Sequence, residues 1–285
     1  MFRTGLQRYY LFLNLQTFSE KFLKICSLFT FRTIFFSNHG ASLNIYIIFV
    51  SRDQNLVLIP TYNEKENISD IIGKVISLPG EFQVLVIDDG SPDGTAQIVK
   101  GLASERVHLI ERPGKLGLGT AYLTGFRWAL ENGYDYIFEM DADFSHNPED
   151  LIRLWGACSN NGADLAVGSR YSNGVSVVDW PMSRIIMSWF ASAYVRTVLG
   201  MKVYDTTAGF VCYSRKVLES IDLDAVRMKG YGFQIEMKYT AWKKGFKLQE
   251  VPIIFTNRQK GTSKMSGGIF GEAFWGVMAL RFRKF

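Results

Sequence analysis

Between residues 55 and 143, short runs of apolar residues alternate with stretches in which apolar residues recur every three or four positions. The runs predict buried strands, and the recurring spacing predicts amphipathic helices. The predicted strands are Leu56–Ile59, Phe82–Ile87, Val107–Ile110 and Tyr136–Met140, and the predicted helices cover residues 68–78, 97–104 and about 119–132. This alternation favours an α/β fold with a mostly parallel sheet and right-handed crossovers.

Polar residues follow three of these predicted strands. Pro60–Glu64 comes after the first strand, Asp88–Asp93 after the second and Asp141–Asp143 after the fourth. Ligands of parallel sheets bind beyond the carboxyl ends of the strands. We therefore expect the three segments to converge on one binding site.

The last of these segments brings two carboxylates, Asp141 and Asp143, to the end of an apolar run. Burying a carboxylate without a partner is costly, and a hard divalent cation is one partner. Mg²⁺ and Mn²⁺ take one or two carboxylates together with phosphate oxygens of a substrate. A strand cap or turn would also explain the pair alone. The convergence with the other two loops favours a metal that holds a diphosphate.

Several sequence motifs occur in a fixed order along residues 55–268. They are Ile59–Glu64, Val86–Thr95, Lys115–Ala121, Met140–Asp143, Gly168–Tyr171, Asp205–Phe210, Gly230–Glu236 and Arg258–Lys264. With these motifs the chain closely resembles glycosyltransferase family 2, and within it the branch that transfers mannose to polyprenyl or dolichyl phosphates. The resemblance implies a GT-A fold, in which helices flank a Rossmann-like, mostly parallel sheet.

The resemblance also implies a reaction. The enzyme would move mannose from GDP-mannose to the phosphate of a polyprenyl phosphate lipid, release GDP and invert the anomeric configuration. Mg²⁺ or Mn²⁺ would be the cofactor. The resemblance implies no protein partner.

On the donor side, the resemblance assigns a nucleoside pocket and a phosphate site. Tyr62 would stack on the base, and Asp89 would accept a hydrogen bond from its edge. Asp88 is interpreted instead as a strand-end cap. Pro60, Glu64 and Ile87 would complete the pocket, and Lys115 in the glycine-rich loop would contact phosphate. That loop lacks the Walker spacing of an ATPase.

Asp141 and Asp143 would hold the metal and serve catalysis, with the backbone of Ala142 close to the substrate and Ser145 as a further metal ligand. The acceptor phosphate would meet basic residues, because arginine forks match phosphate oxygens and lysine adds a point charge. Taken one at a time, each basic residue could be an ordinary solvated surface charge. The basic residues are Arg170, which is also assigned to catalysis, Arg184, Lys229, Arg258 and Lys264.

A lipid phosphate acceptor explains why a catalytic base is hard to find. The sequence has no Gln-x-x-Arg-Trp motif, which processive sugar polymerases of the same family usually carry. A phosphomonoester is already anionic at neutral pH, so it needs positioning and not deprotonation. His146 is therefore interpreted as a structural residue and not as the base.

Two further segments have broad apolar faces. In residues 181–200 the polar positions Arg184, Ser188, Ser192 and Arg196 form one narrow stripe, and residues 269–282 carry apolar side chains followed by basic ones. Such helices lie in a membrane interface or pack into a core. The lipid substrate favours a peripheral enzyme on the cytoplasmic face of the membrane.

Charge is unevenly distributed over the 285 residues. Residues 1–53 hold six basic and two acidic residues, which accounts for +4 of the net charge of +5 and leaves the rest near neutral. A nucleic-acid footprint is therefore not supported. Residues 1–53 also lack a clear helix or strand period. They are predicted to be a poorly ordered extension outside the fold, from an upstream start-codon assignment.

Residues 54–285 are predicted to form the GT-A domain, with a nucleotide-sugar half at 54–145 and an acceptor half at 146–285. Three widely spaced cysteines, Cys26, Cys158 and Cys212, show neither a disulfide nor a zinc pattern. They are interpreted as buried thiols in a reducing compartment.

Three alternatives remain open at this point. A UDP-sugar, for example a glucosyl donor, would use the same motifs. A nucleotide-binding module without activity would leave the acidic pair purely structural. A sugar nucleotidyltransferase would also use paired carboxylates, although those enzymes usually have a glycine-rich loop after the first strand, where this chain has Pro60–Glu64.

Overall fold

The computed structural model describes residues 30–39, 42–50, 53–228, 230–257 and 269–283, in two units, 1–53 and 54–285. In the first unit, β1 (Thr30–His39) pairs antiparallel with β2 (Ser42–Val50). Strands therefore form in two segments for which the sequence shows no clear period. Both are rich in β-branched and aromatic residues, which favour strands even without a period of two. The expected poor order of this region stays a prediction.

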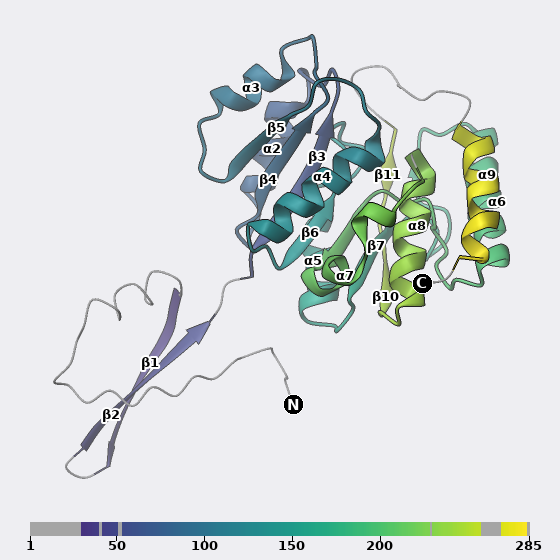
Figure 1. The fold of residues 1–285 in the computed structure, drawn as a ribbon. Helices are drawn as coiled ribbons and strands as arrows, with labels where there is room; N and C mark the ends of the chain where they lie inside the picture. The colour runs from purple at the N-terminus through teal and green to yellow at the C-terminus, as the bar shows by residue number, and fades with distance from the viewer. Residues whose placement is uncertain (1–29, 40–41, 51–52, 229, 258–268, 284–285) are drawn as a thin grey trace. The chain divides into compact units, whose positions relative to one another are not determined.

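The second unit is built on a seven-stranded sheet (Figure 1). Its strands are β3 (Asn55–Thr61), β4 (Gln83–Asp88), β5 (Val107–Glu111), β6 (Tyr136–Glu139), β7 (Leu165–Ser169), β9 (Val211–Ser214) and β10 (Leu248–Pro252). They lie in the order β10-β7-β9-β6-β3-β4-β5, and β9 runs antiparallel to both of its neighbours while the other pairings are parallel. The predicted α/β fold with a mostly parallel sheet is confirmed.

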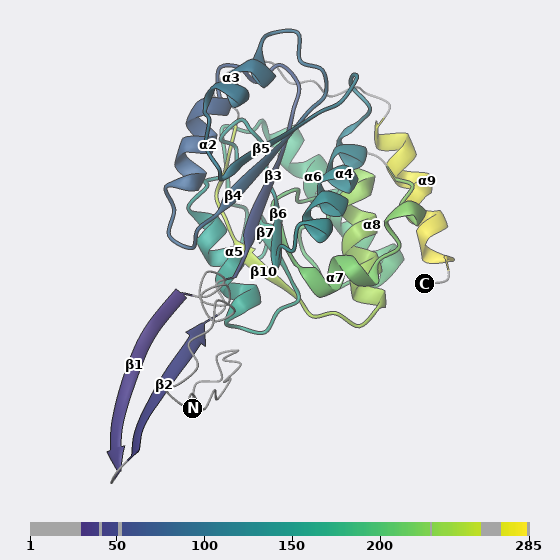
Figure 2. The same cartoon turned by 60° about the vertical axis from the view of Figure 1, so that its left-hand side comes forward.

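Helices cover both faces of this sheet (Figure 2). On one face lie α2 (Ile68–Ile76), α3 (Thr95–Gly101) and α5 (Asp150–Ser159), and on the other α4 (Leu118–Glu131), α7 (Arg215–Ser220) and α8 (Gly230–Lys243). Successive strand side chains point to opposite faces. In β3, Val57 and Ile59 accordingly enter the first core, while Leu56 and Leu58 enter the second.

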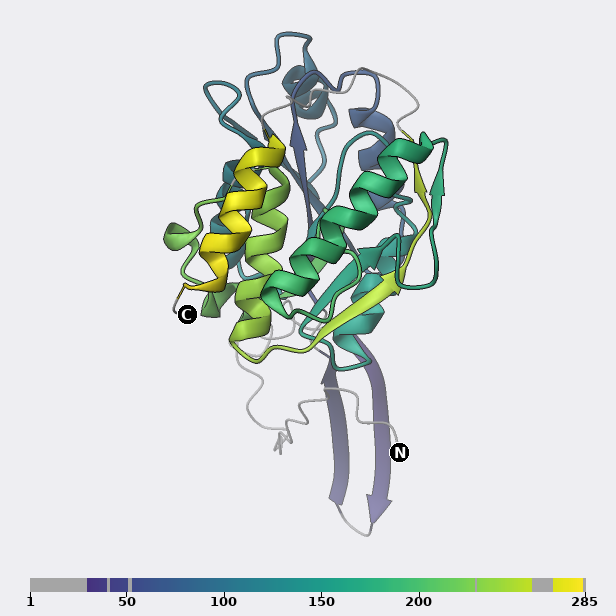
Figure 3. The ribbon, with the colours of Figure 1, turned by 90° about the vertical axis from the view of Figure 1, so that its right-hand side faces the viewer.

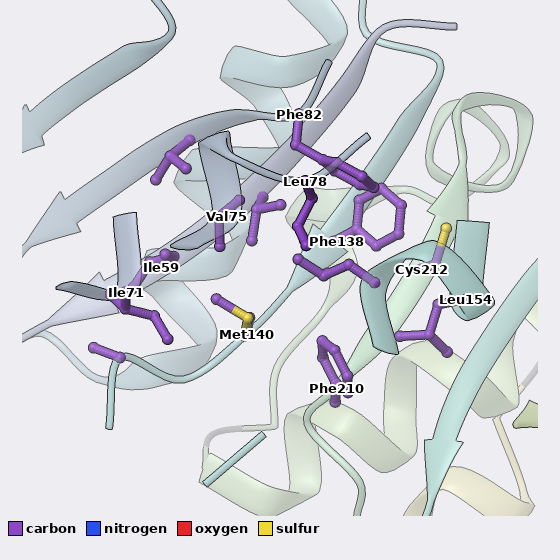
Figure 4. Packing of buried hydrophobic residues seen from close by; sticks show 14 of the residues in the cluster. Ile59, Ile71, Val75, Leu78, Phe82, Phe138, Met140, Leu154, Phe210 and Cys212 are labelled. Carbon is purple, nitrogen blue, oxygen red and sulfur yellow. The ribbon is translucent and has the colours of Figure 1, made fainter. Parts of the chain in front are cut away.

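Aromatic and aliphatic side chains fill the first core (Figure 4). Phe82 meets the edge of Phe138, with ring centroids 5.4 Å apart. Cys212 on β9 belongs to the same core, and both Cys158 and Cys212 are buried free thiols, as predicted. Cys26 lies outside the described residues.

A third, smaller core joins α8 to α6 (Met182–Leu199) and α9 (Ile269–Arg281), which lie side by side (Figure 3). Tyr194 of α6 stacks on Phe274 of α9 at 4.8 Å, and its hydroxyl donates to the Phe274 carbonyl at 3.1 Å. α6 follows Pro181, and Gly200 comes directly after its last residue with a φ of 73°, which suits a helix C-cap. The two predicted helices are thus present. Within the described ranges, no helix combines the length and apolar character needed to cross a bilayer.

Two short elements complete the unit, a strand pair that includes the segment before α6 and a 3-10 turn between α7 and α8. β8 (Val177–Val178) pairs in parallel with β11 (Phe255–Thr256), and a 3-10 turn covers Leu223–Ala225. The β8–β11 pairing brings Phe255 close to the segment that leads into α6. Phe255 is thereby placed among the residues that line the site described next.

Candidate functional site

The three polar segments meet at one edge of the sheet, as the sequence predicts. β3, β4 and β6 end there, because Pro60 pairs with Ile87 and Leu58 pairs with Glu139. β9 begins at this edge, since Val211 pairs with Glu139 and β9 runs the opposite way. Two non-glycine residues in these loops, Asn63 and Phe144, have positive φ angles of 56° and 58°. Such strained backbone is concentrated at functional sites.

Asp88 closes the turn after β4. Its carboxylate accepts hydrogen bonds from the Thr61 hydroxyl at 2.8 Å and from both the backbone N–H and the hydroxyl of Ser91, at 2.8 and 2.6 Å. These bonds are those of a strand-end cap, the role expected for this residue. Asp88 therefore ties the β3 and β4 ends together.

Asp89 forms a buried ion pair that the sequence analysis does not identify. Arg112, just after β5, donates from Nε to Asp89 Oδ1 at 2.6 Å. The same guanidinium donates to the Thr120 hydroxyl at 2.8 Å and to the Gly117 carbonyl at 3.3 Å. Arg112 thus fixes the glycine-rich loop against the segment after β4. Its position at the end of a parallel strand is the signal that could have revealed it.

The remaining residues of the expected donor pocket lie in or just after β3, β4 and β5. The Lys115 ammonium lies 5.3 Å from the centre of the Tyr62 ring, so the glycine-rich loop meets the loop after β3. The Glu64 carboxylate accepts from the Asn67 amide at 3.1 Å, and Pro60 is half-buried. The side chain of Ile87 lies in the second core, so a nucleotide contact from Ile87 would involve its backbone.

The acidic pair is held in a tight turn after β6. Asp143 Oδ1 accepts from the backbone N–H and the hydroxyl of Ser145, at 3.0 and 2.6 Å. The Asp141 N–H donates to His146 Nδ1 at 3.5 Å. Burial lowers the pKa of His146 to about 4, so the imidazole is neutral, and it stacks on Phe210 at 4.7 Å. Ser145 and His146 therefore orient the turn, and Ala142 between the aspartates is buried.

Two cavities open on this turn. A cavity of about 530 Å³ is lined by Asn67, Asp70, Asp143, Phe144, His146, Asn147, Ile254 and Thr256. A smaller one of about 80 Å³ has Asp141, Arg170 and Arg184 in its wall, together with Leu118, Tyr122, His146, Gly168, Trp180, Thr207, Ala208, Gly209, Gly230, Gln234, Ile253 and Phe255. The smaller cavity therefore joins a carboxylate to two guanidinium groups.

Arg170 is held by a buried carboxylate from the segment before β9. Its Nε donates to one oxygen of Asp205 at 2.7 Å, and one terminal nitrogen donates to the other at 2.6 Å. The same terminal nitrogen also donates to the Thr207 hydroxyl at 3.0 Å. Burial alone would raise the pKa of Asp205, but the charge and hydrogen bonds of Arg170 outweigh it and lower that pKa. Arg170 reaches the cavity as part of a rigid ion pair.

Arg184 lies at the start of α6 on the same cavity. Its guanidinium is 3.9 Å from the centre of the Trp180 ring and donates to Asn257 Oδ1 at 3.4 Å. The structure therefore brings together two of the five basic residues expected at the acceptor site. Lys229, Arg258 and Lys264 lie outside the described residues.

The acidic turn fits a divalent cation by the chemistry of its donors. No cluster of three or more metal-ligating side chains occurs among the described residues, so a cage made by protein alone is not present there. Asp141 lines the smaller cavity and Asp143 the larger one, on either side of the same turn. One or two carboxylates of this kind are the protein donors with which Mg²⁺ and Mn²⁺ bind substrate phosphates. Asp141 and Asp143 are the residues that would hold such a cation.

The chain is similar in sequence to known proteins of one family. A family model described as "Glycosyl transferase family 2" matches residues 56–222. A polyprenol monophosphomannose synthase of Mycolicibacterium smegmatis is 50% identical over 232 residues, which cover 79% of this chain and 87% of that protein. An undecaprenyl-phosphate mannosyltransferase of Micrococcus luteus is 48% identical over 231 residues, which cover 79% and 94%.

Among solved structures, a glucosyl-3-phosphoglycerate synthase of Mycobacterium tuberculosis in complex with phosphoglyceric acid matches with a TM-score of 0.62. The match covers 80% of each chain at 18% sequence identity. At this identity the match shows that the fold is shared.

Proposed function

Since the chain belongs to glycosyltransferase family 2 and is therefore a glycosyltransferase, we propose that it transfers mannose from GDP-mannose to the phosphate of a polyprenyl phosphate lipid and releases GDP. The observation that carries the proposal is the small cavity that Asp141 lines together with Arg170 and Arg184. A carboxylate suited to a metal diphosphate lies there beside cations suited to a second phosphate. The names of the two bacterial relatives support the sugar and the lipid.

The donor side of this proposal uses the loops after β3, β4 and β5. Tyr62 offers a ring for the base, and Asp89, held by Arg112, offers an acceptor for its edge. Lys115 beside Tyr62 would meet the phosphates. Pro60, Glu64 and Ile87 would border the nucleoside, and Ala142 would contact the donor through its backbone.

Mg²⁺ or Mn²⁺ bound by Asp141 and Asp143 would offset the negative charge on the departing diphosphate. Ser145 would keep Asp143 oriented through the hydrogen bonds from its hydroxyl and its N–H. Structures of the glucosyl-3-phosphoglycerate synthase were solved with Mn²⁺ or Mg²⁺, which supports the use of a divalent cation here.

The acceptor phosphate needs positively charged side chains that bind it and hold it in position. A lipid phosphate is anionic at neutral pH and attacks the anomeric carbon without losing a proton to the enzyme. Arg184 would bind it directly, and Arg170 would add charge from its fixed place in the wall. His146 is buried and neutral, which suits the structural role expected of it.

The membrane side of the proposal rests on α6. This helix turns its polar stripe inward, where Ser192 is 1% exposed, and turns apolar side chains outward, with Trp189 45% and Phe190 61% exposed. On α9, Trp275 is 71% exposed. A soluble surface would show the reverse pattern. An interfacial face of this kind matches the membrane location of a polyprenyl phosphate.

Peripheral binding at the cytoplasmic face is part of the same proposal. Cys158 and Cys212 are free and buried, which suits a reducing compartment.

Replacing both Trp189 and Phe190 by Ser is expected to lower binding to liposomes at least about tenfold, because burial of two aromatic side chains is lost. Flotation with anionic vesicles measures this. Thr197→Ser on the same helix, which keeps its bond to the Ala193 carbonyl, is the control. Unchanged flotation of the double variant would make this face a core or oligomer contact.

A screen of donors and acceptors tests the function itself. Radiolabelled GDP-mannose and UDP-glucose are each supplied with a short polyprenyl phosphate and Mg²⁺ or Mn²⁺. We expect labelled lipid and free GDP from GDP-mannose. Transfer from UDP-glucose but not from GDP-mannose would show that the donor is a UDP-sugar. Release of pyrophosphate from a nucleoside triphosphate and a sugar phosphate would indicate a nucleotidyltransferase.

A further inference from the structure

Two polar side chains in the small cavity take no part in the assignments above. Tyr122 on α4 and Gln234 on α8 both line it, and they are only 1% and 2% exposed. The Tyr122 hydroxyl has no hydrogen-bond partner within the described part of the chain. The Gln234 Nε2 has no partner of ordinary geometry there either, although the buried Glu139 carboxylate is close enough for a hydrogen bond from Gln234 to oppose the rise that burial causes in the Glu139 pKa. Buried polar groups in proteins are nearly always hydrogen-bonded. Unpaired groups in the wall of a cavity therefore indicate a ligand that supplies the missing bonds.

The orientation of the Gln234 amide is fixed by Lys238, one helical turn further along α8. The Lys238 ammonium donates to Gln234 Oε1 at 3.5 Å, and to the carbonyl oxygens of Thr206 and Ala208 at 3.2 and 2.6 Å. An ammonium can only donate, so it holds the amide oxygen on its own side. The amide NH₂ group has two N–H donors, so beside its contact with Glu139 it keeps one donor for a ligand.

The Tyr122 side chain lines the same cavity as this amide group. Its ring stacks on Phe233, the neighbour of Gln234, with centroids 5.9 Å apart and planes at 10°. Burial raises the pKa of Tyr122 well above its usual value, and the nearby carboxylates Asp141 and Glu139 raise it further. The hydroxyl therefore stays protonated and can both donate and accept a hydrogen bond.

The chemistry of the pair separates it from the phosphate sites. Both groups are uncharged, whereas the diphosphate and the acceptor phosphate are matched by the metal ligands and the arginines around the same cavity. A ligand hydroxyl group both donates and accepts hydrogen bonds, so it matches an amide N–H donor and a phenol. We propose that Gln234 and Tyr122 hydrogen-bond to hydroxyl groups of the hexose carried by the nucleotide sugar, an inference that rests on the transferase function proposed above. Lys238 is then a positioning residue for Gln234.

The experiment compares binding of the sugar nucleotide with binding of the nucleotide alone. Tyr122→Phe and Gln234→Met are each expected to lower kcat/KM for GDP-mannose about tenfold, as for one lost hydrogen bond. Their Kd for GDP is expected to stay at the wild-type value, because GDP carries no hexose. Calorimetry or fluorescence with GDP and steady-state rates with GDP-mannose give the two numbers.

Tyr213→Phe is the matched control. Tyr213 is also wholly buried with a hydroxyl that has no partner in the described residues, but it does not line the cavity. The Tyr213→Phe variant is expected to keep the wild-type kcat/KM for GDP-mannose and the wild-type Kd for GDP. An equal loss of GDP affinity in the Tyr122 or Gln234 variant, or an equal loss of activity in Tyr213→Phe, would overturn the proposal in favour of a purely structural role.

Donors that lack one hydroxyl group sharpen the result. A deoxy-mannose donor missing the contacted hydroxyl is expected to be poorer for the wild type but not for the matching variant, and additive losses with every deoxy donor would contradict a direct contact. If the wild type transfers from another nucleotide sugar, the proposed donor is wrong. The Tyr122 and Gln234 variants are then compared with the wild type using that donor and its nucleoside diphosphate. A loss with the donor alone would still assign the two side chains to the hexose.

Discussion

Replacement of Asp141 by Asn is expected to lower the transfer rate at least about a hundredfold, with the fold intact. The change removes one charge and hardly alters the shape of a half-buried side chain at the end of β6. Asp143→Asn is expected to act similarly, since its carboxylate is the second metal ligand proposed. Initial rates at saturating GDP-mannose and lipid, together with the melting temperature, measure the effect.

Asp150→Asn provides the control for this prediction. Asp150 is a buried acid near the site that is paired with Arg153 at 2.6 Å, and it belongs to α5 and not to the acidic turn. Its variant is expected to stay within a few-fold of the wild-type rate. The metal dependence of GDP binding gives a second readout, which should be strong in the wild type and lost in Asp141→Asn. Turnover near the wild-type rate in both acidic-turn variants would refute the metal assignment.

Replacement of Arg170 by Ala is expected to abolish transfer and also to destabilise the protein by roughly 3–5 kcal/mol, because it leaves Asp205 buried and uncompensated. For a unit of this size the melting temperature would fall by roughly 10 °C. Binding of GDP should change less than transfer to the lipid phosphate. A stronger effect on GDP binding would move Arg170 to the donor site.

A double variant separates these two effects. Arg170→Met together with Asp205→Leu removes both charges from the buried site, a kind of exchange that often restores stability. We expect the melting temperature to recover and the transfer activity to stay lost. Recovery of both would mean that the ion pair is purely structural.

The repeating elements of residues 54–285 could be predicted because each depends on a local hydrophobic pattern. The strand from Leu56 and the helix from Ile68, for example, agree with the structure to within a few residues. The convergence of the three polar loops follows from the parallel sheet, which the alternation of elements already implies. The acidic turn after β6 could therefore be located from sequence.

The partners of the buried charges could not be predicted in the same way. Asp89 meets Arg112, and Arg170 meets Asp205, across 23 and 35 residues of sequence. Which charges meet depends on the order of the strands, and the antiparallel placement of β9 has no local signal. Periodicity also locates the polar stripe of α6 but not the side that it faces. In the structure, that stripe faces the protein.

The position of β9 has a consequence for how the chain is made. β9 lies between β6 and β7 and pairs with both of them. β6 and β7 therefore cannot be joined in one sheet until residues near Ser214 have left the ribosome. The parallel group β6-β3-β4-β5 can assemble earlier from contiguous sequence, whereas β7 must wait for a strand that is synthesised after it. During that interval β6 presents an open edge, the feature of nascent sheets that invites aggregation. Nascent chains that stop between β7 and β9 are therefore expected to depend most on chaperones.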